Sequence, residues 1–108
     1  MNINQAANNF FNDENIRQQA ISDLAEIISI PSVAGEAEGI YPYGKVCAQA
    51  LDKAAELAKK YGFRYENHDY HCMSILYGDA EQEIGIVCHL DVVPAGEGWS
   101  HDPFGGEI

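Results

Sequence analysis

The sequence predicts an α/β fold in which two amphipathic helices precede a mixed sheet of about three strands. In two stretches the apolar residues recur at three- and four-residue spacing, which is typical of helices with one buried face. After them come short apolar or alternating runs, which glycine and polar turn residues separate. This order is compatible with a three-layer α/β domain of which the 108 residues supply the N-terminal portion.

Both helices have recognisable ends. Asn12 or Asp13 can cap the first helix, and Pro31 stops it because the residue before a proline disfavours helical geometry. The second helix is expected over residues 43–61, where Gly62 supplies a left-handed C-terminal stop. The alanines of its apolar stripe predict close packing against a sheet.

Three strands are expected after the helices. Residues 63–67 alternate between apolar and polar side chains, as a half-exposed edge strand does, and residues 72–77 form a second strand. The short connection between them favours antiparallel pairing. In the stretch that begins at Glu83, the apolar residues 84–87 predict a buried third strand, and residues 105–108 resemble the start of another.

Composition narrows the function. Six Lys and Arg against 17 Asp and Glu give a net charge of −11, which disfavours binding to nucleic acid or to anionic membranes. Three widely spaced cysteines indicate reduced thiols rather than a disulfide framework, and Cys72 and Cys88 are expected to be buried. Residues 1–12 form an Asn-rich, loose lead-in that lacks the features of a signal peptide. We therefore expect a cytoplasmic protein.

The third predicted strand ends in a pair of residues with metal-site chemistry. His89 and Asp91 are two positions apart, so on an extended chain their side chains point to the same side. Neutral imidazole is a good ligand for a divalent metal, and a carboxylate commonly holds its second ring N–H. In open α/β sheets such strand ends are where ligands bind. Taken alone, the pair is weak evidence, and a strand-end histidine followed by a turn-forming aspartate would be the favoured interpretation.

The surrounding string HLDVVPAGEGWSHDPFGGEI resembles the first metal-binding segment of the M20 family of metallopeptidases, and within it the PepV-type dipeptidases. The resemblance implies a zinc-peptidase-like catalytic domain with two divalent ions, zinc by default and manganese or cobalt as alternatives. It makes His89 the first metal ligand and Asp91 a catalytic residue that supports the metal from behind. It places Trp99, His101 and Phe104 in the wall of the substrate pocket, and a metal-ligand role for His101 stays open.

The resemblance also implies what this segment lacks. The remaining metal ligands and the glutamate general base of the family would follow Ile108, so the chain is expected to be an incomplete catalytic domain over residues 1–108 and inactive alone. The implied substrate is a dipeptide or an N-acyl amino acid. The alternatives are a related M20 desuccinylase or deacetylase, and a truncated non-catalytic module that self-associates through an open sheet edge.

Other residues that could carry chemistry have ordinary interpretations. Ser32 follows a proline and is expected to be a turn serine, because no base is evident near it. His68 and His71 form an H-x-x-H, but side chains three apart on a strand face opposite ways. Glu36 and Glu38 lie among glycines and are expected to be solvated charges.

Overall fold

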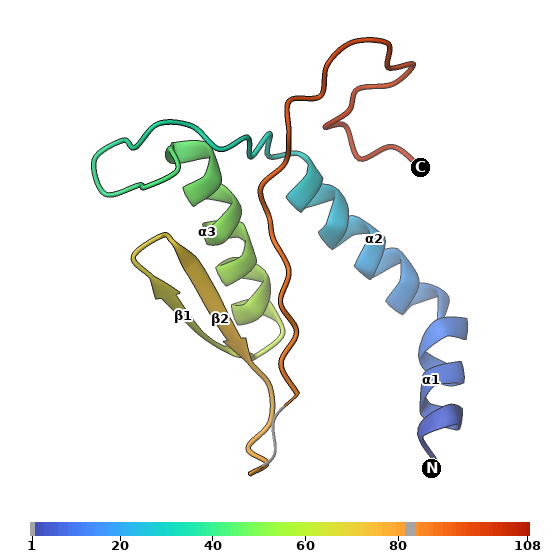
Figure 1. Ribbon diagram of the computed structural model, residues 1–108. Coiled ribbons are helices and arrows are strands. Elements are labelled where there is room, and N and C mark those ends of the chain that lie inside the picture. Colours follow the sequence, from blue (N-terminus) through green and yellow to red (C-terminus); the bar gives the residue numbers. More distant parts are fainter. Residues whose placement is uncertain (1, 82–83) are drawn as a thin grey trace.

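The computed structural model describes residues 2–81 and 84–108 and has three helices and one β-hairpin in those ranges. The elements follow in the order α1 (Ile3–Asn12), α2 (Glu14–Ile28), α3 (Lys45–Lys60), β1 (Arg64–His68) and β2 (Cys72–Leu76). The hairpin lies against α3, and α1 precedes α2 and adjoins its N-terminal end, on the side away from the hairpin (Figure 1). Helices packed with a sheet confirm the α/β class, whereas the three-layer domain stays a prediction.

The ends of α2 lie close to the positions that the sequence predicts. The Asp13 carboxylate accepts hydrogen bonds from the backbone N–H groups of Asn15 and Ile16, which have no partner within the helix. Helix α2 ends at Ile28, three residues before Pro31, and Ser29 is its C-terminal cap.

Helix α3 has both a predicted and an unpredicted cap. Gly62 has a φ of +73°, and the N–H of Phe63 donates to the Ala58 carbonyl, so the left-handed stop is confirmed. At the other end the Glu38 carboxylate accepts from the Lys45 N–H at 3.1 Å. Glu38 is therefore not only a solvated charge, because it also satisfies a free donor at the positive end of the helix.

Residues 64–76 form the predicted antiparallel hairpin. Arg64 pairs with Leu76 and His68 with Cys72, and a tight turn joins the strands. Asp69 and Tyr70 have φ values of +53° and +59°, as in the primed turns that match the twist of a hairpin. The two strands are the only hydrogen-bonded sheet in the part of the chain that the structure describes.

The lead-in predicted to be loose over residues 1–12 is helical from Ile3 to Asn12, and residue 1 lies outside the described residues. The Asn2 side chain caps α1 by accepting from the Gln5 N–H at 2.9 Å. Helix α1 buries none of its residues, and Ile3 is 85% exposed. With no buried residue to hold it, α1 has the local cap at Asn2 as a stabilising contact, which its polar composition alone does not indicate.

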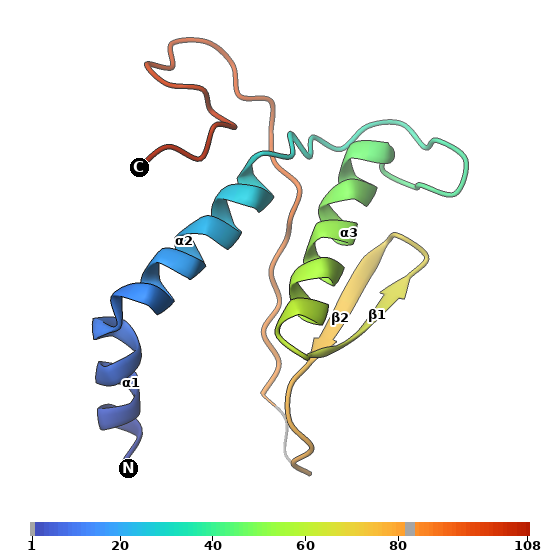
Figure 2. The ribbon, with the colours of Figure 1, turned by 180° about the vertical axis from the view of Figure 1, so that it is seen from behind.

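The third predicted strand does not form a ladder. Residues 84–91 are extended but unpaired, and the side chains of Ile84, Ile86 and Val87 are 94%, 88% and 99% exposed. Glu83, with which the predicted stretch begins, lies outside the described residues. The segment passes between α2 and α3 in both views of the ribbon (Figures 1 and 2). An apolar run has strand structure only where a neighbouring strand supplies backbone hydrogen bonds, and among the described residues no backbone group pairs with residues 84–91. Val92, directly after them, forms an isolated parallel bridge with Val33. Residues 105–108 likewise form no strand.

The buried core is small and lies on α3. Its buried apolar residues are Ala48, Ala50 and Ala58, with 4%, 1% and 3% exposure. Cys72 and Cys88 are exposed, so the prediction that both are buried is wrong. Cys72 begins β2 and Cys88 lies in the unpaired extended segment, and the described residues supply no layer that covers them. Within residues 2–81 and 84–108, no helix combines the length and apolar character needed to cross a membrane.

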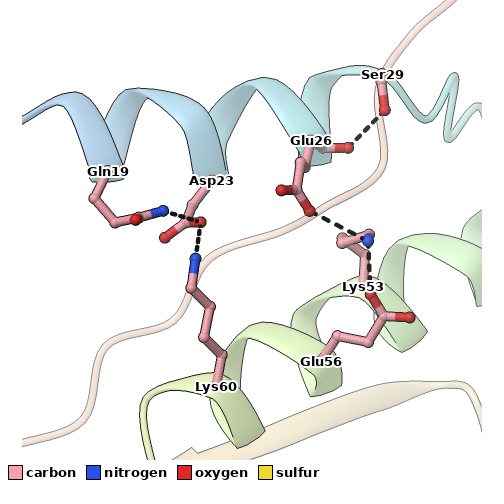
Figure 3. Close-up of polar contacts among 7 residues, drawn as sticks. All are labelled: Gln19, Asp23, Glu26, Ser29, Lys53, Glu56 and Lys60. Atoms are coloured by element: carbon pink, nitrogen blue, oxygen red, sulfur yellow. Dashed lines mark hydrogen bonds and ion pairs between the residues drawn. The ribbon is translucent and has the colours of Figure 1, made fainter.

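Polar side chains join α2 to α3 at two places (Figure 3). At the first, the Asp23 carboxylate accepts from Lys60 Nζ at 2.6 Å, from Gln19 Nε2 at 3.1 Å and from the Tyr61 hydroxyl. At the second, Lys53 Nζ lies 3.3 Å from Glu26 Oε2 and also pairs with Glu56. Asp23 is 8% exposed, so the first contact is the buried one.

Candidate functional site

His89 and Asp91 contact each other directly. The His89 Nδ1 atom lies 3.0 Å from the Asp91 backbone oxygen and 3.2 Å from Asp91 Oδ1. Both acceptors face the same ring nitrogen, which favours the tautomer that carries its proton on Nδ1. The Nε2 lone pair is then free of these contacts. A metal-binding histidine has this arrangement, with one nitrogen held by a carboxylate or carbonyl and the other directed at the ion.

The two side chains are also accessible. The side chains of His89 and Asp91 are 82% and 58% exposed, so an ion or a further protein segment can approach them. They line a cleft of about 450 Å³ between the hairpin, α3 and the 88–91 segment. Its other walls are mostly apolar and include Tyr43, Cys47 and Leu51.

A buried serine holds the His89 segment in place. Ser32 is 2% exposed, and its hydroxyl donates to the Leu90 carbonyl at 2.7 Å. Its own carbonyl accepts from the Val92 N–H at 3.1 Å. The sequence suggests only a turn serine, because nothing local in it relates positions 58 apart. The proline before Ser32 and the loop position were the only available signals.

Cys47 lies at the same junction. Its thiol contacts the Ser32 carbonyl at 3.4 Å from the face of α3. Burial raises the pKa of the Cys47 thiol, and the Asp91 charge raises it further, so the thiol is protonated and can donate. Helix α3, the segment after α2 and the His89 segment therefore meet at Ser32.

The three residues predicted for the pocket wall lie elsewhere. Trp99 and His101 line a second hollow of about 380 Å³ next to Ile28, and neither they nor Phe104 line the His89 cleft. Trp99 Nε1 donates to the Ala95 carbonyl, which closes the loop on itself. The structure thus brings His89 and Asp91 together but does not bring Trp99, His101 and Phe104 to them.

The other candidate histidines have local partners. His101 Nδ1 pairs with Glu107 Oε2 at 2.8 Å. His68 Nε2 lies 2.8 Å from the Ser74 hydroxyl, and the His71 ring packs edge-on against Tyr43. The H-x-x-H of the hairpin is therefore part of the turn and its cross-strand contacts.

The donor set fits one ligand of a metal site and its support. His89 presents a nitrogen that suits a divalent metal, and Asp91 holds the opposite side of the ring. Across residues 2–81 and 84–108, no three His, Cys, Asp or Glu side chains gather closely enough to hold an ion. A protein metal site normally uses at least three such ligands, so His89 would need partners from additional chain.

The chain is similar to bacterial proteins named as dipeptidases. It is 41% identical over 90 residues to the Beta-Ala-Xaa dipeptidase of Lactobacillus delbrueckii subsp. lactis, which covers 82% of this chain. It is 38% identical over 94 residues to a Bacillus subtilis (strain 168) protein provisionally named dipeptidase YtjP, and 40% identical over 88 residues to a Staphylococcus haemolyticus protein with a provisional dipeptidase name. The chain spans only 19% to 20% of the length of these relatives. No family model matches it.

Proposed function

We propose that this chain is the N-terminal portion of a metal-dependent dipeptidase of the M20 type, similar to the PepV-type enzymes, in which His89 binds one of two divalent ions. The observation that carries the proposal is the His89–Asp91 pair, in which one ring nitrogen is held and the other is left for an ion. About 40% identity over four fifths of the chain to proteins named as dipeptidases supports it.

In this proposal each residue has a distinct task. His89 holds the ion through Nε2, and Asp91 keeps the proton on Nδ1 and orients the ring. The bound ions would polarise the amide carbonyl of the substrate and activate water. The remaining ligands and the general base would come from the further chain that the longer relatives have. Zinc is the default ion, with manganese and cobalt as alternatives.

The substrate class follows from the relatives. One of them carries the name Beta-Ala-Xaa dipeptidase, so dipeptides with an N-terminal β-alanine are the first substrates to test. N-acyl amino acids are the alternative, because an M20 desuccinylase or deacetylase would use the same His89–Asp91 pair. Trp99, His101 and Phe104 would then reach the substrate only if their loop moves toward His89.

A non-catalytic module is the second candidate. The exposed apolar side chains of residues 84–87, which belong to the unpaired extended segment, favour it. In that case the chain would bind another polypeptide by strand pairing and would hydrolyse nothing.

The test is a chimera in which this chain replaces the matching 90 residues of the Lactobacillus relative. We expect the chimera to hydrolyse β-alanyl dipeptides and to lose this activity on chelation, with recovery when Zn²⁺ or Mn²⁺ is added. A chimera that unfolds cooperatively, as the parent does, but hydrolyses neither dipeptides nor N-acyl amino acids would favour the non-catalytic module.

The isolated chain gives a complementary test. We expect the 108-residue chain to show no dipeptide hydrolysis with any divalent metal, because His89 alone cannot hold a catalytic ion. Metal-dependent turnover by the purified chain that His89→Ala abolishes would refute this expectation.

A further inference from the structure

Ser32 contacts both peptide groups that flank Asp91. Its hydroxyl donates to the Leu90 carbonyl, which belongs to the peptide group between residues 90 and 91. Its carbonyl accepts the N–H of Val92, which belongs to the next peptide group. One residue that is 2% exposed thus fixes the backbone on each side of Asp91.

The second contact determines where the Asp91 carbonyl points. In a planar trans peptide group the N–H and C=O point in opposite directions. Because the Val92 N–H is directed at Ser32, the Asp91 carbonyl must point away from Ser32. On that side it lies 3.0 Å from His89 Nδ1.

The first contact explains why a serine is needed. In a parallel strand pairing, a backbone N–H of residue 32 would be the donor for the Leu90 carbonyl. Here the Ser32 N–H already donates to the Ile30 carbonyl at 2.8 Å, across the turn that Pro31 makes. The Ser32 hydroxyl, at 2.7 Å from the Leu90 carbonyl, takes the place of the missing backbone donor.

We propose that Ser32 is a positioning residue for the His89–Asp91 pair: it holds the two peptide groups around Asp91 so that Asp91 secures His89 Nδ1 and Nε2 stays available to a metal. This role rests on the proposed function of His89 as a metal ligand. Ser32 itself touches neither ring nitrogen and acts through the backbone of residues 90–92.

The experiment compares the chain with its Ser32→Ala, Ser32→Thr and Ser29→Ala variants by isotope-resolved NMR. Ser32→Ala removes the hydroxyl donor, and Ser32→Thr retains it. Ser29→Ala is the matched control, because Ser29 also donates to a backbone carbonyl at 2.7 Å, that of Glu26 in the last turn of α2. The readouts are the Leu90 carbonyl ¹³C shift, the His89 ring ¹⁵N shifts and exchange of the Val92 amide.

In Ser32→Ala we expect a change in the Leu90 carbonyl shift and a loss of the single Nδ1–H tautomer of His89. The apparent Kd for Zn²⁺ alone, measured on the chimera with the Lactobacillus relative, which would supply the further ligands, should rise roughly 10-fold, as for other outer-shell partners of a metal ligand. Ser32→Thr and Ser29→Ala should retain the wild-type tautomer and Kd.

Two results would overturn the proposal. One is a Ser32→Ala variant that keeps Val92 protected from exchange and shows the wild-type tautomer and Kd. The other concerns the case in which Ser32→Ala loses the protection of Val92, so that Ser32→Thr becomes the informative variant. A Ser32→Thr variant that keeps Val92 protected but has altered His89 signals would then contradict a role for the hydroxyl. Unaltered His89 signals in Ser32→Thr would support that role. A chimera without dipeptidase activity would refute the proposed function but leave these ring signals as they are.

Discussion

Asp91 holds His89 through two atoms rather than one. The backbone oxygen at 3.0 Å and the carboxylate oxygen at 3.2 Å both face Nδ1, so the carboxylate adds charge to a contact that the backbone already orients. A carboxylate behind the ring of a metal-binding histidine fixes the ring's tautomer and orientation. The side chain and the backbone of Asp91 therefore make separate contributions to metal binding: the backbone orients the ring and the side chain adds negative charge.

Substitution of Asp91 tests that separation. In Asp91→Asn the backbone contact remains while the negative charge is lost, so we expect Zn²⁺ affinity at His89 to fall by about 10- to 100-fold. The measurement is Zn²⁺ binding to the chimera with the Lactobacillus relative, which would supply the further ligands. Asp102→Asn is the control, because Asp102 accepts from the Phe104 N–H in the loop and does not line the His89 cleft. Equal affinities of the chimera and of its Asp91→Asn variant would contradict a supporting role for the carboxylate.

The sequence predicts the local half of the site but not the distant half. His89 and Asp91 are two residues apart, so their mutual contact depends only on local backbone geometry. Ser32 reaches them across 58 positions, which depends on how the chain folds back along α3. For Trp99 and His101 the prediction rested on family resemblance, and the structure places both in a different hollow.

At the scale of elements, the contact between α2 and α3 depends on Asp23. The hydrogen bond from Lys60, and next that from Tyr61, hold the pKa of the Asp23 carboxyl below its ordinary value near 3.8. Hydrogen bonds and ion pairs to a charged carboxylate favour its ionised form. The contact is therefore a source of stability that depends on Asp23 being ionised.

This contact should make the folded state sensitive to acid. A carboxyl group whose pKa is lowered by folding stabilises the folded state above its ordinary pKa, and this contribution disappears as the pH falls through the lowered value. We expect the free energy of unfolding to decrease as the pH falls below about 4, and Asp23→Asn to be less stable at neutral pH with a weaker dependence on acid. Urea unfolding between about pH 6 and pH 2.5 measures both.

Glu26→Gln is the matched control for Asp23. Glu26 also contacts a lysine of α3, but its side chain is 51% exposed and such exposed pairs contribute little to stability (Figure 3). If Glu26→Gln and Asp23→Asn reduce stability equally at neutral pH, the buried contact at Asp23 has no special part in joining the helices.

The elements themselves were predictable where their signals are local. The helix ends lie near Asp13, Pro31 and Gly62, as expected, because caps and stops act over a few residues. The extended segment at residues 84–87 shows the opposite case. Its apolar run predicts a buried strand, but burial needs a partner, and its side chains are almost fully exposed. A pattern of apolar residues indicates which face of a segment can be buried, but it does not indicate whether another strand or helix is present to cover that face.

The whole molecule is more open than its size requires. The radius of gyration is 16.4 Å, whereas a compact domain of 108 residues has about 13 Å. Its accessible surface is 8720 Å², against about 6000 Å² for a compact protein of 11.9 kDa. The buried apolar core of the described residues consists of three alanines. Substantial apolar surface is therefore left without a covering layer.

We expect this surface to cause self-association of the isolated chain. Val87 is 99% exposed in an unpaired extended segment, where another copy can pair with it. Val87→Lys should reduce the association and change the stability of the folded chain by no more than about 0.5 kcal/mol. Light scattering across a concentration series measures the effect. The control is Ile40→Lys, because Ile40 is 72% exposed in a loop outside the segment. A monomer that unfolds cooperatively at all concentrations would contradict the expectation.

The most direct test of a metal-ligand role for His89 is the activity of the chimera with the Lactobacillus relative after His89→Ala. His68→Ala is the control, because His68 contacts the Ser74 hydroxyl across the hairpin and does not line the His89 cleft. We predict that His89→Ala lowers kcat/KM for a β-alanyl dipeptide by more than the 10- to 100-fold that loss of an outer-shell partner costs, and that His68→Ala changes it little. A folded His89→Ala chimera with the kcat/KM of the unsubstituted chimera would contradict the account.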